Sequence, residues 1–265
     1  MTGMRHRTLV FVHAHPDDEA LLTAGTMARA ADEGHRVVLV VATDGAAGLA
    51  SSAIGDLATV RSGELAESAR ILGVHRTVTL GYPDSGLHAE NPDGLAHVGR
   101  FQIGRRIAQI CDEEGADILV GYDRSGGYGH PDHVQVHRSV RTAQTLAARP
   151  PRLFEATLPR EPIVRAVRAA ALSRITPAGF DPAEFDDAWT RRDDITHRVD
   201  VRPQLARKVA ALRAHASQAT SDGTTRTLAV LTRLPGPLRT LLLGTEYYAA
   251  VPTSATMSST RRGES

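Results

Sequence analysis

Two short segments of the chain place imidazole and carboxylate side chains close together. The first, residues 12–19, reads VHAHPDDE. His15 and Asp18 are three residues apart, so a turn can direct both at one metal ion and leave Asp17 to face a water molecule on that ion. The same residues also suit an ordinary helix start, because proline and carboxylates are favoured at the positive end of a helix. This segment alone therefore leaves a metal site and a helix start open.

The second segment, residues 121–133, reads GYDRSGGYGHPDH and ends in two histidines around an aspartate. Two such segments on separate loops could supply three metal ligands and leave one position open for water. The competing interpretation is that His130 and His133 only cap a helix. We favour the metal site, because strongly hydrated side chains in a glycine-rich turn contribute little to packing.

Short apolar runs precede both segments and alternate with longer amphipathic stretches. The runs predict strands at residues 8–12, 36–42, 77–80 and 117–121, and the amphipathic stretches predict helices at residues 19–33, 59–72, 101–114 and 132–148. This alternation predicts an α/β fold with a Rossmann-like, mostly parallel sheet flanked by helices. In such a sheet functional groups gather beyond the carboxyl ends of the strands, so we expect the two segments to meet there.

The pattern changes after Pro150 and Pro151. Further strands are predicted at residues 153–157, 195–201 and 245–251, with a helix at residues 205–215. We interpret residues 1–150 as a Rossmann-like catalytic core, residues 151–252 as a C-terminal α+β elaboration of the same domain, and residues 253–265 as a flexible tail.

Composition argues against several classes of protein. The 265 residues include 31 Lys and Arg against 30 Asp and Glu, and the net charge of +1 argues against binding to nucleic acid or an anionic membrane surface. Cys111 is the single cysteine, so a metal site must use His, Asp or Glu. The chain lacks an apolar run of the roughly 18 to 20 residues that span a bilayer and lacks a signal-peptide pattern, so a cytoplasmic protein without membrane insertion is expected. Composition leaves open whether it forms a homo-oligomer.

Three common α/β motifs are missing from the sequence. No G-x-G-x-x-G turn follows the first predicted strand, which argues against a dinucleotide-binding protein. Neither a G-x-S-x-G elbow nor a G-x-x-x-x-G-K-[ST] loop occurs, which removes the main support for an α/β-hydrolase or a P-loop protein. The functional prediction therefore depends on the two segments that combine His and Asp.

With two further segments, these motifs make the chain resemble the LmbE-like, or PIG-L, family of zinc-dependent N-deacetylases. The family signature A-H-P-D-D-E corresponds to residues 14–19, and G-H-x-D-H corresponds to residues 129–133. Arg61 in VRSGEL and Asp84 in YPDSGL match the family's substrate-loop patterns in the expected order. The resemblance spans about residues 8–145.

The opening of the chain is particularly similar to deacetylases of the mycothiol pathway and to a related amidase. One loop differs, because residues 43–49 read TDGAAGL and lack the glutamate-containing stretch of those enzymes. This difference favours another N-acetylated amino sugar or a glycosylated metabolite over a mycothiol precursor. Weaker similarity to the family continues at residues 208–218 and 244–248.

By position, the resemblance implies a metal centre with a base beside it. The implied zinc ligands are His15, Asp18 and His133, and the implied general base is Asp17. Fe²⁺ also suits a site of two histidines and one aspartate.

The resemblance also implies groups that act on the substrate. His130 would face the reacting carbonyl, and Asp132 would orient and charge-stabilise the imidazole of His130. Tyr128 would help to polarise the carbonyl. Arg61 and Asp84 would hold sugar hydroxyls or an attached anionic group.

The predicted reaction is removal of an N-acetyl group from an N-acetylglucosaminyl-type small molecule or a glycosylated metabolite. The metal would make a water molecule acidic, and Asp17 would take its proton. Protonated His130 or Tyr128 would help to stabilise the tetrahedral oxyanion. The proton for the leaving nitrogen comes from Asp17 or from His130, and the sequence leaves both open.

Two other functions compete with this one. The first is an amidase that cleaves a larger acyl group from a thiol conjugate or a natural product. The second is a non-catalytic, metal-containing ligand-binding module. The presence of Asp17 and His130 beside the implied ligands argues against the second, because a purely structural zinc site normally closes its fourth position with a protein ligand.

Overall fold

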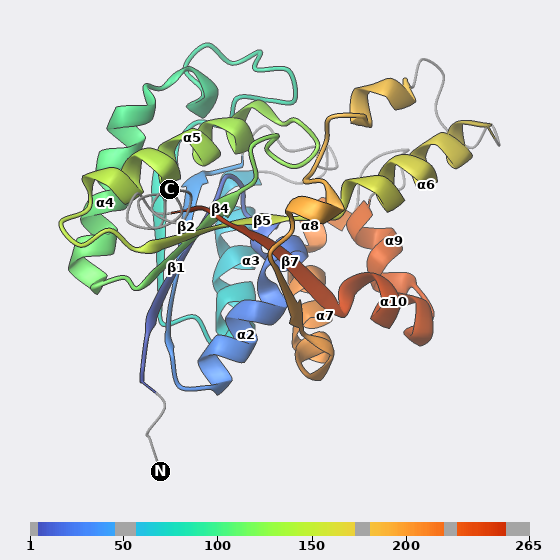
Figure 1. Ribbon diagram of the computed structural model, residues 1–265, viewed down its shortest axis with the longest axis horizontal. Helices are drawn as coiled ribbons and strands as arrows, with labels where there is room; N and C mark the ends of the chain where they lie inside the picture. Colours follow the sequence, from blue (N-terminus) through green and yellow to red (C-terminus); the bar gives the residue numbers. More distant parts are fainter. Residues whose placement is uncertain (1–4, 46–56, 173–180, 220–226, 253–265) are drawn as a thin grey trace, which may run out of the picture.

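One sheet of seven strands runs through the described part of the chain (Figure 1). The structure is a computed structural model that describes residues 5–45, 57–172, 181–219 and 227–252. The strands are β1 (Thr8–His13), β2 (Arg36–Thr43), β3 (Arg76–Tyr82), β4 (Ile118–Tyr122), β5 (Arg152–Thr157), β6 (His197–Asp200) and β7 (Thr245–Ala250). Their order is β3-β2-β1-β4-β5-β7-β6. The first five are parallel, and β7 runs antiparallel to β5 and β6. The predicted mostly parallel α/β sheet is confirmed.

The central strands are buried on both faces, as their continuous apolar sequences predict. Along β1, Val10 and Val12 point into one hydrophobic core, and Leu9 and Phe11 point into a second core on the opposite face. This alternation is the two-residue period of a strand. Helices must therefore cover both faces of the sheet.

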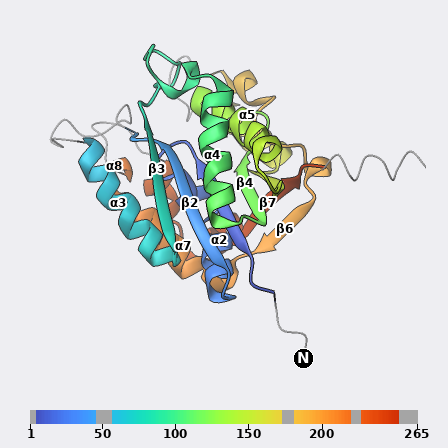
Figure 2. The ribbon, with the colours of Figure 1, turned by 90° about the vertical axis from the view of Figure 1, so that its left-hand side faces the viewer.

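Two layers of helices provide this cover (Figure 2). On one face lie α4 (Arg100–Glu114) and α5 (Pro131–Leu146), and on the other lie α2 (Ala24–Asp32), α3 (Leu57–Leu72) and α7 (Leu205–Ala214). Ile103 and Val140 bury the first layer against the sheet, and Met27 and Leu212 bury the second. The predicted helices at residues 59–72, 101–114, 132–148 and 205–215 thus agree with the structure to within a few residues at their ends.

The helix predicted at residues 19–33 is two helices, α1 (Asp18–Leu22) and α2. Thr23 interrupts them with a backbone φ of −134°, and its Oγ1 lies 2.8 Å from Nε2 of the buried His13. Its hydroxyl also donates weakly to the carbonyl of Glu19 at 3.4 Å. Threonine side chains compete in this way with the backbone bonds of a helix. Because of this break, α1 and α2 are separate helices, which the apolar periodicity alone could not predict.

The C-terminal part completes the sheet and adds further helices to α7. Its helices are α6 (Arg160–Leu172), α8 (Ala216–Ala219), α9 (Thr227–Arg233) and α10 (Gly236–Leu243). Short 3₁₀ turns occur at Leu95–His97, Pro182–Phe185, Arg192–Asp194 and Arg202–Gln204. The tail predicted at residues 253–265 lies outside the described residues. Among the residues that the structure describes, no helix has the length and apolar character needed to cross a membrane.

Candidate active site

The sheet order reverses at β1, which pairs with β2 on one side and with β4 on the other. The segment that starts with His15 follows β1, and the segment that ends in His133 follows β4 and opens α5. Loops at such a switch point diverge from one another beyond the strand ends and leave room for a ligand. The structure brings the two segments together there, as the sequence predicts.

Three potential metal-ligand atoms form a nearly equilateral triangle. His15 Nδ1 lies 3.4 Å from Asp18 Oδ2, His133 Nε2 lies 3.3 Å from the same oxygen, and the two nitrogens are 3.3 Å apart. In a tetrahedral zinc site, ligands at about 2.0–2.1 Å from the ion lie about 3.3–3.4 Å from one another. The triangle therefore fits one divalent metal ion with a fourth position open.

Two wider groups share His15 with this triangle. The first consists of His15, His133 and His130, and the second of His15, Asp84 and Asp132, with potential ligand atoms within 4.8 Å of one another. In the second group Asp132 already accepts two hydrogen bonds from a neighbouring loop. The tighter triangle is therefore the better fit to a coordination shell.

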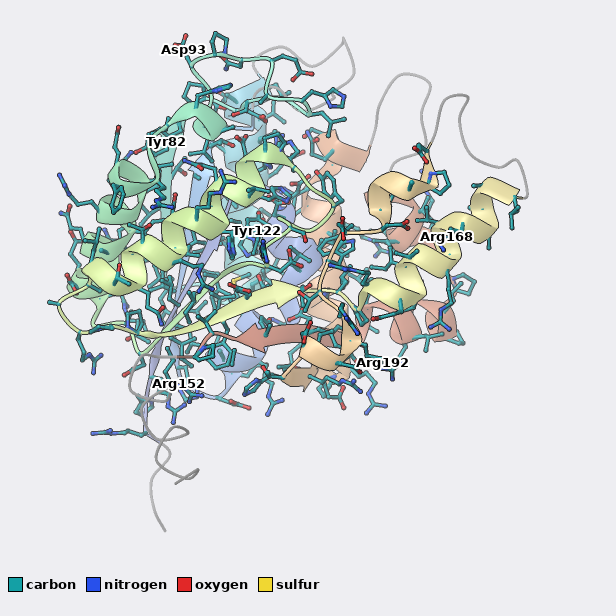
Figure 3. All side chains as sticks on the ribbon, turned by 45° about the horizontal axis from the view of Figure 1, so that its top comes forward. Tyr82, Asp93, Tyr122, Arg152, Arg168 and Arg192 are labelled. Atoms are coloured by element: carbon teal, nitrogen blue, oxygen red, sulfur yellow. The ribbon has the colours of Figure 1, made fainter. Side chains whose placement is uncertain are left out.

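Tyr122 lies at the end of β4, in the interior of the molecule (Figure 3). It contacts two corners of the triangle. Its hydroxyl donates to Asp18 Oδ2 at 2.6 Å and accepts from the backbone N–H of Ala14 at 2.8 Å. Its ring stacks on His133 with a centroid distance of 4.2 Å. Tyr122 is not among the site residues expected from the sequence. The available signal was its position, because the last residue of β4 lies directly before the glycine-rich loop.

The carboxylate of Asp132 lies on His15 rather than on His130. Its Oδ2 is 3.1 Å from His15 Nε2, and the backbone N–H and hydroxyl of Ser85 both donate to this carboxylate. Asp84 Oδ1 lies 3.6 Å from the same imidazole nitrogen. The geometry corrects the expectation that this carboxylate orients His130, because Asp132 contacts that ring through its backbone N–H at 3.2 Å instead. A carboxylate on Nε2 leaves Nδ1 of His15 to face a metal.

The electrostatics of the triangle favour a cation. Burial alone would lower the pKa of His15, but the carboxylates of Asp132 and Asp18 raise it to about 10. Burial would raise the pKa of Asp18, and His133 and His15 together hold it well below its usual range. The site thus stabilises positive charge at the position where a metal ion would replace the proton.

Asp17 has the environment of a base. It stands at the start of α1 with a backbone φ of 119°, a conformation that is uncommon for a residue other than glycine. Burial and the neighbouring Asp18 raise its pKa to about 6, although the guanidinium of Arg61 opposes this shift. A carboxylate whose pKa approaches neutrality is suited to take a proton and return it.

Arg61, which is implied to contact substrate, lies inside the protein. It is 2% exposed, its Nη1 donates to the carbonyl of Gly45 at 2.6 Å, and its Nη2 donates to the carbonyl of Pro16. Its Nη2 also lies 3.4 Å from Asp17 Oδ1. In this arrangement the guanidinium contacts the motif after β1, and its contact with a sugar stays a prediction.

The glycine-rich loop carries Tyr128 and His130. Gly126 has a φ of 63°, and a Cβ there would lie 2.6 Å from a backbone nitrogen of α5, so only glycine fits without displacement. The side chain of Trp189 packs on this loop, and the backbone N–H of Trp189 donates to the carbonyl of Gly127 at 2.9 Å. Trp189 belongs to the hydrophobic core and thus connects the loop to that core.

His130 and Tyr128 provide hydrogen-bond donors beside the triangle. Burial, followed by the nearby His15 and His133, lowers the pKa of His130 to about 4, so its imidazole is neutral at pH 7. Burial and nearby carboxylates raise the pKa of Tyr128 well above its usual value, so its hydroxyl keeps its proton. Tyr128 is 45% exposed at the rim of the site. The two rings lie edge to face with centroids 6.0 Å apart.

The chain matches known proteins over the region that carries both motifs. The family model described as GlcNAc-PI de-N-acetylase (PIG-L) matches residues 10–144, which include both motifs. The 1D-myo-inositol 2-acetamido-2-deoxy-α-D-glucopyranoside deacetylase of Kineococcus radiotolerans is 36% identical over 252 residues, which cover 82% of this chain and 70% of that protein. The enzyme of the same name from Mycobacteroides abscessus is 38% identical over 253 residues, with 88% and 89% covered.

A solved structure shares the fold. The N,N'-diacetylchitobiose deacetylase from Pyrococcus horikoshii superimposes with a TM-score of 0.61 at 20% identity, covering 93% of this chain and 84% of that one. At this identity the likeness concerns the fold alone. The family model and the two relatives carry the assignment further, and the chain belongs to the PIG-L family.

Proposed function

We propose that this protein is a metal-dependent deacetylase that hydrolyses the acetamide of an N-acetylglucosaminyl unit in a small glycoside. The observation that carries the proposal is the triangle of His15, Asp18 and His133 at 3.3–3.4 Å, with the half-buried carboxylate of Asp17 adjacent to Asp18 in the sequence. An open metal position beside a base of nearly neutral pKa is the arrangement that hydrolysis of an amide requires.

The donor set supports zinc as the resident ion, held by His15 Nδ1, Asp18 Oδ2 and His133 Nε2. When bound, such an ion polarises a carbonyl oxygen and makes a water molecule more acidic. Fe²⁺ accepts the same nitrogen and oxygen donors, so the metal of the purified protein decides between the two.

Asp17 acts as the general base in this proposal. Its carboxylate accepts a proton from the attacking water, and the new oxygen–carbon bond converts the acetamide carbonyl into a tetrahedral oxyanion. Asp17, now protonated, then donates that proton to the nitrogen as the carbon–nitrogen bond breaks. Acetate and a free amine leave.

His130 supports the oxyanion as a neutral hydrogen-bond donor. Its Nδ1 accepts the backbone N–H of Asp132, so the ring proton of the neutral imidazole stands on Nε2. This proton and the hydroxyl of Tyr128 are the donors available to the developing negative charge. A pKa lowered to about 4 disfavours the protonated form, which supports Asp17 rather than His130 as the acid for the leaving nitrogen.

The substrate class follows from the relatives and is the part of the proposal that most needs testing. Both relatives are named as deacetylases of a 2-acetamido-2-deoxy-glucopyranoside of myo-inositol. Residues 43–49 favour another N-acetylated amino sugar, and within them only Thr43, Asp44 and Gly45 are described. Because the two relatives match 82% and 88% of this chain, we place the inositol glycoside first among candidate substrates and a simple N-acetylglucosaminide second. The proposal locates the activity in the cytoplasm.

The decisive experiment combines metal content with release of a primary amine. Protein purified without added metal or chelator should contain about one zinc or iron per chain, and Asp18→Ala should lose it. The wild-type protein should release amine from the inositol glycoside or the simple glucosaminide and should act poorly on an analogue with a bulky acyl group. Preference for the bulky acyl group would favour the amidase, and a metal with four protein ligands and no turnover would favour the ligand-binding module.

A further inference from the structure

The peptide group between Pro16 and Asp17 is hydrogen-bonded on both its carbonyl and its N–H to buried charged side chains. Arg61 Nη2 donates to the carbonyl of Pro16, and Glu19 Oε2 accepts from the N–H of Asp17 at 2.9 Å. The carbonyl and the N–H belong to the same peptide group. A cation on the oxygen and an anion on the N–H fix the plane of that group, because each bond is charge-assisted.

Glu19 is in turn held from two other elements. Ser68 of α3 donates from Oγ to Glu19 Oε1 at 2.6 Å, and His215, which follows α7, lies with Nε2 at 2.6 Å from the same oxygen. Because an ionised carboxylate only accepts, His215 Nε2 is the donor. Glu19, Ser68 and His215 are each 0% exposed. The side chain that holds Asp17 therefore depends on a histidine 196 positions away from Glu19 in the sequence.

This cluster is poorly explained by stability. Buried ionic groups are often replaced by well-packed apolar residues without loss of stability. The conformation of Asp17, with φ at 119°, is also unfavourable for a residue other than glycine and persists only where surrounding contacts impose it. Glu19 is too deeply buried to touch a substrate. Its position on the N–H of Asp17 is thus the feature that distinguishes it from an ordinary core residue.

We propose that Glu19 and His215 are positioning residues that hold the general base Asp17 in its left-handed conformation, with His215 supplied by the C-terminal part of the chain. The inference rests on the proposed function for the role of Asp17. It concerns the orientation of the base and leaves the three metal ligands unchanged. Loss of His215 should therefore reduce turnover without releasing the metal.

The test compares His215→Ala with His215→Gln, whose side-chain amide retains an N–H donor near the position of Nε2. His197→Gln, at an exposed histidine of β6, serves as the matched control. Each variant is purified with its metal, and three properties are measured: metal content, kcat and KM for the acetylated glycoside, and the proton chemical shift of the Asp17 amide. If His215→Ala does not fold, Ser68→Ala removes the other hydrogen bond to Glu19 and takes its place.

His215→Ala should lower kcat by about 10- to 100-fold with KM within a few-fold of the wild-type value, because small displacements of a reacting group have effects of this size. The metal should stay bound, the Asp17 amide proton should move upfield as its hydrogen bond weakens, and His215→Gln should restore most of both properties. An unchanged amide shift, an unchanged kcat, or loss of the metal would overturn the inference. If the wild-type protein deacetylates nothing, the proposed function fails, and the amide shift still decides whether His215 positions Asp17.

Discussion

The N-terminal and C-terminal parts of the molecule contribute to the candidate site in different ways. Residues 8–146 carry every side chain at which we place chemistry, in the segments that follow β1 and β4 and extend into the first turns of α1 and α5. The described residues between positions 152 and 250 place no side chain in the metal triangle, but Trp189 packs on the glycine-rich loop and His215 bonds to Glu19. Reacting groups therefore come from short segments beside their strands, whereas their orientation is fixed by residues far away in the sequence.

The sharpest test of the N-terminal part is Asp17→Asn. The amide keeps the size of the side chain but accepts no proton, so kcat should fall by about 10²- to 10⁴-fold. The metal content should stay at the wild-type level, because Asp17 is outside the metal triangle. Asp18→Ala is the matched control, since it should release the metal. A nearly normal rate in Asp17→Asn would remove this residue from the role of base.

Tyr122→Phe separates the support of the metal ligands from the ligands themselves. The phenyl ring retains the stacking on His133, whereas Asp18 and the N–H of Ala14 lose their hydroxyl partner. Metal affinity should fall by about 10- to 100-fold, as for other partners of metal ligands. Competition with a chelator of known affinity measures this change. Tyr82→Phe, on β3, is the control and should bind metal normally, and equal affinities in the two variants would contradict the assigned role of Tyr122.

The fold and the meeting of the two His- and Asp-containing segments can be predicted from the sequence because they depend on local patterns. Continuous apolar runs identify the buried strands, and His15, Asp18 and His133 lie in the two segments that follow β1 and β4. The break of the first predicted helix at Thr23 was missed, because it depends on a contact with His13 rather than on periodicity. Local sequence thus predicts which residues share an edge of the sheet.

The partners of the site residues are less readable, because they are set by tertiary packing. The sequence around Asp132 does not indicate that its carboxylate contacts His15 and not the neighbouring His130. Arg61 likewise fits a substrate-loop pattern but is directed by α3 at backbone carbonyls. His215 lies in a segment of weak family similarity whose contact with Glu19 only the fold reveals.

The general base Asp17 should also give kcat/KM a pH dependence, which is a smaller effect than its replacement. The carboxylate of Asp17 must be ionised to accept a proton, and its pKa is raised to about 6. Below that pH the protonated, inactive form accumulates, so kcat/KM should fall about tenfold per pH unit. Metal content measured at each pH separates this effect from protonation of the ligands. A flat profile between about pH 7 and pH 5 with metal retained would contradict the assignment.

The C-terminal part offers the opposite case, a buried ion pair whose loss should leave turnover unchanged. Lys208 Nζ lies 2.6 Å from Glu246 Oε1, and both side chains are 2% exposed. Glu246 also accepts from the N–H groups of Gly25 and Thr26 at the start of α2. Glu246→Ala should reduce the free energy of unfolding by about 3–5 kcal/mol, because it leaves Lys208 buried without a partner.

Lys208→Met should reduce the free energy of unfolding by less than Glu246→Ala, because Glu246 keeps donors from α2 and from the hydroxyls of Thr26 and Tyr248. Denaturant unfolding measures both variants, and kcat per folded molecule should match the wild-type value in each. These two variants test whether buried charged groups of the C-terminal part affect turnover in general, or only where they contact the segment after β1. A large loss of kcat in Lys208→Met would mean that the partner of Glu246 affects turnover as the partner of Glu19 is proposed to do. Positioning would then be a property of the C-terminal part as a whole.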